Sequence, residues 1–354
     1  MDFLAGSDIK VVIAFWLGVG LVLMTVIMLS VILLKRETFL HRERVHAQAE
    51  RFWRPILEGG GDLPASGIPT LSAAQLSGFL SVWNDLHEQL HGETTPHLSR
   101  VAQEAGLEDH LHRVLGGGDF PMRLVSIIAL GHVKNGRSFD RVAPFIHDRS
   151  SIVSLCAARA LMQIDQVRAV FMFVPQIVRR SDWSQGSIAA ILREADDPAV
   201  SNELVRATLH ATEDVAPRLI RFLANVSEEA VAPIIRKSLC SSTDERLIST
   251  CLQVMSRPAQ LDCVRPLHTH PRWHVRMQAA VTLGRLGSAA DEALLVPMLG
   301  DSQWWVRYRA AQALLSLPTV GRPGLHRIRD AQTDPYAHDI IVHVLAETAL
   351  KDAA

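Results

Sequence analysis

Histidine is the residue type in this chain that could most readily bind a metal ion. The 16 histidines include two close groups, His110 with His112, and His268, His270 and His274 around a predicted turn. A zinc site needs three or four ligands held by supporting hydrogen bonds, and no further ligand accompanies either group. A di-iron site built from His-Glu pairs would need several such pairs, and the chain has one, His87–Glu88. We therefore expect no metal, no cofactor and no catalytic residues.

Arginine recurs at a fixed position, where it could bind a partner. Arg276 and Arg307 each follow a predicted core valine, and Arg123 holds the same place in an earlier copy. A row of arginines could recognise carboxylates or phosphates of a partner. Alternatively, each arginine pairs with a loop aspartate such as Asp301 and holds adjacent repeats in register. We favour this second, structural interpretation.

Tryptophan marks the starts of successive predicted helices near the C-terminus, at Trp273, Trp304 and Trp305. These rings either pack between repeats or anchor a partner, since Trp and Arg dominate the energetics of protein interfaces. Packing is the interpretation that we favour, and the other stays open. Tyr336 and Asp339 extend the same edge into the last predicted repeat. The candidate partner-binding residues are therefore Trp273, Arg276, Trp304, Trp305, Arg307, Arg309, Tyr336 and Asp339.

The elements that must position these residues are copies of one unit. The segments His274–Leu286 (HVRMQAAVTLGRL) and Trp305–Leu317 (WVRYRAAQALLSL) match, with equivalent residues 31 positions apart. Further copies begin near Met122, Val153, Ser184, Val215, Arg246 and Ala337. A fixed period of this size indicates a repeat protein whose helical pairs stack on one another. We therefore predict an all-α fold with a right-handed α-solenoid of about eight helical pairs over residues 119–354.

Two residues of the unit have expected structural roles. Asp301 precedes the first helix and is expected to cap it by accepting free backbone N–H groups. The second helix, about Ser288–Leu299, contains Pro297, and equivalent prolines recur in other copies. Because proline removes one backbone hydrogen bond, we expect this helix to bend at that point.

The N-terminal region contains an apolar segment, residues 11–34, without any charged side chain. As a helix it would be about 36 Å long, enough to cross a hydrocarbon core of roughly 30 Å. A cleaved signal peptide fits less well, because acidic residues precede the segment and no small-residue cleavage site follows it. Lys35, Arg36, Arg42 and Arg44 come directly after it. By the positive-inside rule we predict a single-pass membrane protein with its N-terminus outside and its repeats in the cytoplasm.

The remaining boundaries follow from composition. Residues 1–10 form a short extracytoplasmic N-terminus, and residues 35–57 continue as a juxtamembrane helix. Residues 58–70 are rich in Gly and Pro and are expected to act as a hinge between the anchor and the body. Residues 71–118 are helical but outside the repeat pattern, as a cap for the end of the array would be.

Charge and cysteine content exclude further classes of protein. The formal net charge is −1, whereas a dedicated nucleic-acid-binding protein has a basic face, so we expect no nucleic-acid partner. The four cysteines, Cys156, Cys240, Cys251 and Cys263, form no CxxC pair. They are interpreted as small buried apolar residues in a reducing compartment.

The repeat pattern resembles a known class. The VRxxAAxxLGxLG pattern of Val275–Gly287, with Asp301 and the VRxRAAxAL of Val306–Leu314, resembles the short HEAT-like repeats named after phycobilisome lyases. The chain also resembles a narrower group of bacterial membrane-anchored HEAT proteins. The shared pieces are the N-terminal span, the Trp83–Asn84 helix, the block from Trp304 and the tail 334–347.

Members of this narrower group accompany a membrane glycosyltransferase of the family 2 kind. The resemblance thus implies a location in the bacterial inner membrane and a glycosyltransferase of a cell-surface polysaccharide system, such as an exopolysaccharide, as the protein partner. The lyase name transfers no activity, because the repeats carry only packing residues. We expect a non-catalytic scaffold or accessory protein. The alternatives are a general adaptor of another membrane or signalling complex, and an enzyme with an unrecognised site.

Overall fold

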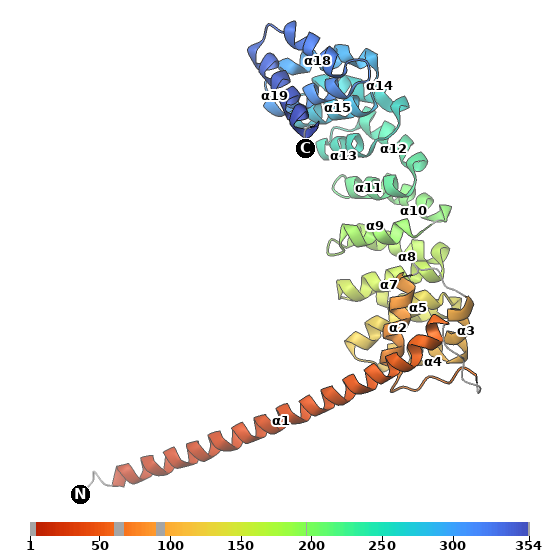
Figure 1. Cartoon of the computed structure of the whole chain (residues 1–354), viewed down its shortest axis with the longest axis vertical. Coiled ribbons are helices and arrows are strands. Elements are labelled where there is room, and N and C mark those ends of the chain that lie inside the picture. The colour runs from red at the N-terminus through yellow and green to blue at the C-terminus, as the bar shows by residue number, and fades with distance from the viewer. Residues whose placement is uncertain (1–4, 60–66, 90–95, 196, 353–354) are drawn as a thin grey trace. The chain divides into compact units, whose positions relative to one another are not determined.

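The computed structural model describes residues 5–59, 67–89, 96–195 and 197–352, and these residues are helical with no strand among them. Figure 1 shows the succession of helices along the chain. They divide into two compact units, residues 1–145 and 146–354. The all-α prediction is confirmed.

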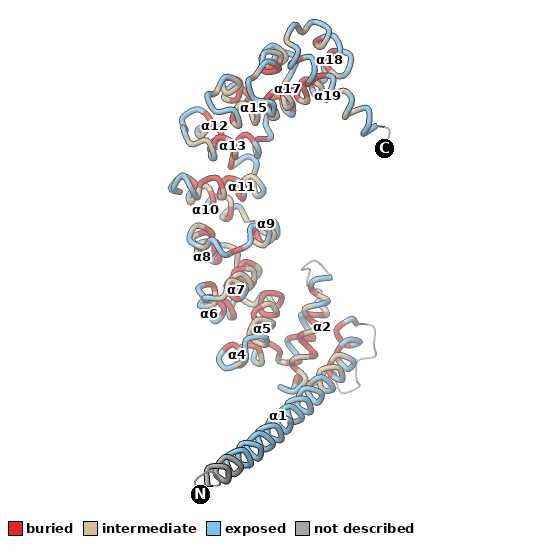
Figure 2. The backbone as a smooth tube through the Cα atoms, turned by 90° about the vertical axis from the view of Figure 1, so that its left-hand side faces the viewer, coloured by how far each residue is buried: buried red, intermediate tan, exposed pale blue. Residues whose placement is uncertain are grey.

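The first unit contains one very long helix and several short ones. Its elements are α1 (Ala5–Glu58), α2 (Leu76–Gln89), α3 (Pro96–Glu104), α4 (Leu107–Gly117), α5 (Phe120–Val133), η1 (Gly136–Ser138) and α6 (Phe139–Val142). Helix α1 has 54 residues, and its residues 13–41 are exposed, as the pale blue part of α1 in Figure 2 shows. Its most apolar window has a mean hydropathy of 2.8 and no buried residue. Length and composition fit a membrane span, and signal sequences share both properties.

The last turns of α1 belong to the folded unit rather than to a free flank. Ala49, Trp53, Ile56 and Leu57 recur at helical spacing and are buried, and α1 packs on α2 and α3. At Gly78 an added Cβ would lie 2.5 Å from the carbonyl oxygen of His46, so only glycine allows this close approach of α2. Contacts therefore join the helices before and after the expected hinge at 58–70. The sequence analysis did not identify these four residues as buried because charged residues lie between them.

Large rings fill the interior of the first unit. Trp53 meets Phe79 edge-on at a centroid distance of 4.9 Å, and Phe79 stacks on Trp83 at 5.9 Å. Trp83 then lies 4.6 Å from His87, which stacks on His132 of α5 at 4.7 Å. This chain of rings crosses from α1 through α2 to α5.

The second unit is a stack of helical pairs. After η2 (Ala143–His147), its elements are α7 (Ser151–Ile164), α8 (Gln166–Arg179), α9 (Gln185–Arg193), α10 (Pro198–Leu209), α11 (Ala216–Val226), α12 (Glu228–Ser241), α13 (Glu245–Val254), η3 (Pro258–Gln260), α14 (Leu261–Val264), η4 (Arg265–Thr269), α15 (Trp273–Leu286), η5 (Ala289–Asp291), α16 (Glu292–Leu295), η6 (Pro297–Gly300), α17 (Trp304–Ser316), α18 (Gly321–Asp330) and α19 (Pro335–Asp352). The first helices of the pairs begin within three residues of the predicted starts. Six pairs and the single helix α19 build this α-solenoid, and α5 with α6 has the same form in the first unit.

The second element of a pair takes two forms. In α8 and α12, Pro175 and Pro233 lie inside one continuous helix of 14 residues. Around Pro297, however, the expected bent helix at 288–299 is instead three short pieces, η5, α16 and η6. The missing proline N–H and the clash of its ring with the preceding turn account for the break before η6.

Candidate partner-binding surface

Small residues set the contact between the twin helices α15 and α17. A Cβ added at Gly284 would lie 2.5 Å from the Cα of Ala313, so the backbones touch at this point. The paired alanines of both helices, Ala279, Ala280, Ala310 and Ala311, are fully buried. Close packing of this kind fixes the position of the residues that begin each helix.

Arg276 joins the two twin repeats through an ion pair. Its Nε donates to Asp301 Oδ2 at 2.6 Å and its Nη2 donates to Asp301 Oδ1 at 2.8 Å, with both side chains largely buried. Burial alone would raise the pKa of Asp301, but hydrogen bonds from Arg276 and the Gln303 N–H outweigh it and lower that pKa. The predicted pairing of Arg276 with Asp301 is confirmed.

The expected capping role of Asp301 is wrong. Helix α17 begins at Trp304, with Gln303 at the N-cap position and no side-chain cap. Asp301 accepts the Gln303 N–H at 2.9 Å, one position before the helix would need it. Asp301 lies two residues before the N-cap, and its carboxylate binds Arg276 instead of the first turn.

Arginines also bind the carbonyl oxygens of the loops between pairs. Arg276 Nη1 donates to the oxygen of Pro271 at 3.1 Å, Arg307 Nη1 to that of Ser302 at 3.3 Å, and Arg123 Nη2 to that of Gly118 at 3.1 Å. Each acceptor lies five residues before its arginine. The arginine at this repeated position thus binds the loop that precedes its own helix.

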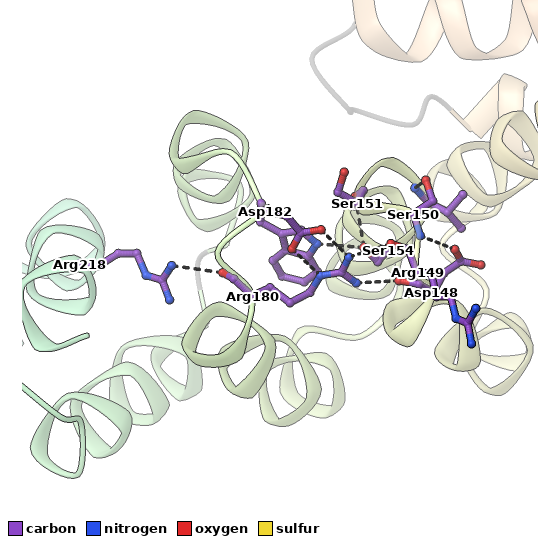
Figure 3. Close-up of polar contacts among 10 residues, drawn as sticks. Asp148, Arg149, Ser150, Ser151, Ser154, Arg180, Asp182 and Arg218 are labelled. Carbon is purple, nitrogen blue, oxygen red and sulfur yellow. Dashed lines mark hydrogen bonds and ion pairs between the residues drawn. The ribbon is translucent and has the colours of Figure 1, made fainter. Parts of the chain in front are cut away.

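In α7 the position after the core valine is Ser154, and Arg180 from the loop after α8 binds the loop instead. Figure 3 shows Arg180 reaching back to the loop before α7, where it donates to the carbonyl oxygen of Asp148 at 2.7 Å and to that of Arg149 at 3.3 Å. Asp182 holds the same guanidinium at 2.7 Å. Arg218 in turn donates to the carbonyl oxygen of Arg180 at 3.2 Å. Sequence reasoning missed Arg180 and Arg218 because neither occupies the repeated position.

Aromatic rings gather on α17 and α19. Trp304 stacks on Tyr308 at 5.0 Å with an interplanar angle of 10°, and meets Trp305 edge-on at 4.8 Å. The ring centre of His343 on α19 lies 6.3 Å from that of Trp304, so Trp304 also packs between repeats. The guanidinium of Arg307 lies 5.5 Å from the ring centre of Tyr336. We call Trp304, Trp305, Arg307, Tyr308 and Tyr336 the aromatic surface.

This surface remains accessible despite its internal contacts. Trp304 is 42% exposed, Trp305 51% and Tyr336 69%. Tyr308, which sequence reasoning missed, is its centre, and its hydroxyl donates to Glu347 Oε2 at 2.6 Å. The spacing of four residues from Trp304 was the available signal, since such residues share one helix face. Both interpretations of the tryptophans thus keep support, packing for Trp304 and exposure for Trp305.

The other candidates lie apart from the stacked rings or at their edge. Arg309 has its guanidinium 5.6 Å from the ring centre of Tyr308. Trp273 contacts its neighbour His274 edge-on at 5.8 Å, and Asp339 Oδ1 lies 3.6 Å from His338 Nδ1. The structure therefore brings Arg309 to the aromatic surface, while the contacts found for Trp273 and Asp339 are with their own neighbours.

Histidines of the two groups singled out in the sequence bind other residues of the protein. His268 Nδ1 lies 2.7 Å from the carbonyl oxygen of Arg265, His274 pairs with Glu245 at 2.9 Å, and His112 Nε2 lies 2.9 Å from Ser138 Oγ. Among the described residues no three His, Cys, Asp or Glu side chains are grouped to hold a metal ion. His87 is fully buried, and burial, with a smaller contribution from Lys134, lowers its pKa from 6.5 to about 4.

The cysteines differ from the expectation that all are buried. Cys251 is buried, and burial raises its pKa to about 12. Cys240 is exposed, and Cys156 and Cys263 are half-buried. Cys240 lies in the last turn of α12 and is not among the buried residues of that helix, Val231, Ile234, Ile235 and Leu239.

Comparison with known proteins agrees with the repeat pattern. A family model described as HEAT repeats matches residues 246–315, which run from α13 to the end of α17 and include both twin segments. No curated protein matches the chain. An engineered protein of known crystal structure aligns over 84% of this chain and 94% of its own, with 17% identity and a TM-score of 0.33.

Proposed function

We propose that this chain is a membrane-tethered, non-catalytic scaffold whose α-solenoid binds a protein partner through the aromatic surface. HEAT repeats generally mediate protein–protein contacts, and a HEAT model matches the twin repeats. The apolar part of α1 is long enough to serve as the tether. The observation that carries the proposal is the exposure of Trp305 and Tyr336 beside Arg307, the residue types that supply most hot spots in interfaces.

We further propose that the partner is a membrane glycosyltransferase of a cell-surface polysaccharide system. This assignment rests on the resemblance to membrane-anchored bacterial HEAT proteins. In this proposal the chain lies in the bacterial inner membrane with its N-terminus outside. The basic residues directly after the apolar segment support a cytoplasmic solenoid. An adaptor of another membrane or signalling complex is the alternative that the same surface would serve.

A pull-down in mild detergent, with the tagged full-length chain at native level and mass spectrometry, tests both parts. We expect a glycosyltransferase in the wild-type eluate and at least a tenfold lower recovery with Trp305→Ala combined with Tyr336→Ala, because two hot-spot truncations together cost more than about 1.4 kcal/mol. Phe171→Ala is the matched control, since Phe171 on α8 is 56% exposed and lies outside the surface.

The possible outcomes separate the two proposals. Recovery of a different membrane protein that depends on Trp305 and Tyr336 would replace the glycosyltransferase and keep the surface. Equal recovery of every partner by the double variant and by Phe171→Ala would overturn the surface itself. Unchanged thermal unfolding of the double variant is required in both cases.

A further inference from the structure

A groove in the middle of the solenoid is independent of the aromatic surface. It has a volume of about 830 Å³ and is lined by the end of α8, the start of α9, the N-terminal half of α11, most of α13 and His274 of α15. Its lining contains four arginines and two acidic residues: Arg179, Arg218, Arg221, Arg246, Asp214 and Glu245. Four arginines against two carboxylates make its wall basic, in a chain whose formal net charge is −1.

The two carboxylates of the wall are already bound within the protein. Glu245 accepts from Arg272 at 2.5 Å and lies 2.9 Å from His274 Nε2. The side chain of Asp214 accepts the hydroxyl of Thr212, and this hydrogen bond lowers its pKa. Glu245 is thus paired with cations other than the four arginines, whereas Asp214 keeps its charge and attracts Arg218.

The arginines divide into bound and available groups. Arg218 is held by main-chain carbonyl oxygens, including that of Val178 at 3.2 Å. Arg221 makes one hydrogen bond, to Thr250 Oγ1 at 3.1 Å. Arg179 and Arg246 are exposed and have no ion pair within the described part of the chain. The guanidinium groups of Arg179 and Arg246 are thus available to a ligand, as are the N–H donors of Arg221 that do not bind Thr250.

The form of the groove suits an extended chain. It crosses three successive first helices, and packed helices lie about 8–10 Å apart, so its length is roughly 20 Å. An extended peptide of about six residues covers this length at about 3.3 Å per residue. Gln185, Ser249 and Gln253 line the wall between the arginines and can bond to peptide main-chain groups.

We propose that this groove binds an acidic, extended peptide segment of a partner protein. Its carboxylates would be held by Arg179, Arg221 and Arg246, because a guanidinium binds a carboxylate through two parallel hydrogen bonds. Asp214 and Glu245 interrupt the basic wall, so it suits carboxylates spaced along a peptide better than a continuous row of phosphates. Binding here does not require the aromatic surface, so the two sites can fail separately.

Fluorescence anisotropy with the full-length chain in detergent micelles tests the proposal. The probes are a labelled octapeptide of alternating Glu and Ser, the same peptide with Gln in place of Glu, and an oligothymidine of equal charge. We expect the Glu peptide to bind at least tenfold more tightly than the Gln peptide. Arg179→Glu combined with Arg246→Glu should weaken this binding at least tenfold. Arg193→Glu, an exposed arginine of α9 outside the groove, is the matched control and should leave it unchanged.

Three results would overturn the proposal. Equal binding of the Glu and Gln peptides would show that charge is not recognised. Equal binding of the Glu peptide by the double variant and by Arg193→Glu would place the site elsewhere. Tighter binding of the oligothymidine through the same arginines would identify a nucleic-acid site instead. Trp305→Ala with Tyr336→Ala should retain peptide binding, which keeps this test apart from that of the proposed function.

Discussion

The two units of the molecule are stabilised by different kinds of contact. In the first, large rings form a continuous buried series from Trp53 to His132. In the second, the twin helices meet through alanine and glycine, and arginines fasten the loops at their ends. The rings give the first unit a few large contacts, and the twin repeats meet through many small ones. Earlier in the second unit, Phe173 and Trp183 also form a buried pair of rings.

The difference follows from repetition. A repeat must present nearly the same surface to the copy before it and to the copy after it, and small residues satisfy both sides. A unit without repeats has no such restriction and can fill its interior with unique large side chains. Substitutions should therefore cause large losses of stability at a few positions of the first unit. In the second unit the losses should be smaller and spread over more positions.

Replacement of Trp53 should have the largest effect. Trp53→Ala removes a fully buried ring that contacts Phe79, and we expect a loss of about 3–5 kcal/mol in the stability of the first unit. Phe52→Ala is the control, because Phe52 is 44% exposed on the same helix and should cost less than about 1 kcal/mol. Urea unfolding followed by hydrogen exchange in α2 gives the measurement. Equal small losses would show that the end of α1 is a free flank.

Acid should weaken the first unit through His87. The folded pKa is lowered from 6.5 to about 4, so the folded state resists a proton that the unfolded chain accepts. Stability is fully present above pH 6.5 and falls as the pH drops toward 4, by up to about 3 kcal/mol. The difference between the stability profiles of wild type and His87→Leu measures this contribution. If the stability profiles of wild type and His87→Leu run parallel between pH 7 and 4, the expected contribution of His87 is contradicted.

The smallest effect is expected for the arginines of the twin repeats, Arg276 and Arg307. Arg276→Gln leaves the carboxylate of Asp301 without its charged partner but with the hydrogen bond from the Gln303 N–H, and we expect a loss of about 2 kcal/mol. Arg307→Gln loses a loop hydrogen bond and a ring contact and should cost about 1 kcal/mol. Urea unfolding of each variant, with Asp301→Asn and the double variant, gives the coupling energy. A coupling near zero would mean that the ion pair does not hold the repeats.

The sequence predicted the repeats well because their physics is local. The valine, paired alanines and period of 31 residues around Val275 and Val306 predict helical pairs, and the match to HEAT repeats covers this region. The same pattern predicted the pairing of Arg276 with Asp301. The break at Pro297 was missed, since Pro175 and Pro233 occupy continuous helices and proline alone does not determine which form results.

The sequence by itself thus determined the helices, their repeating faces and the apolar N-terminal segment, because each depends on residues close along the chain. Only the tertiary structure decided which side chains meet. The burial of Trp53 against Phe79, the binding of an earlier loop by Arg180 and the hydrogen bond from Tyr308 to Glu347 join residues that are far apart along the chain. Such contacts depend on helix-to-helix distances of a few ångströms, which packing sets and periodicity does not encode.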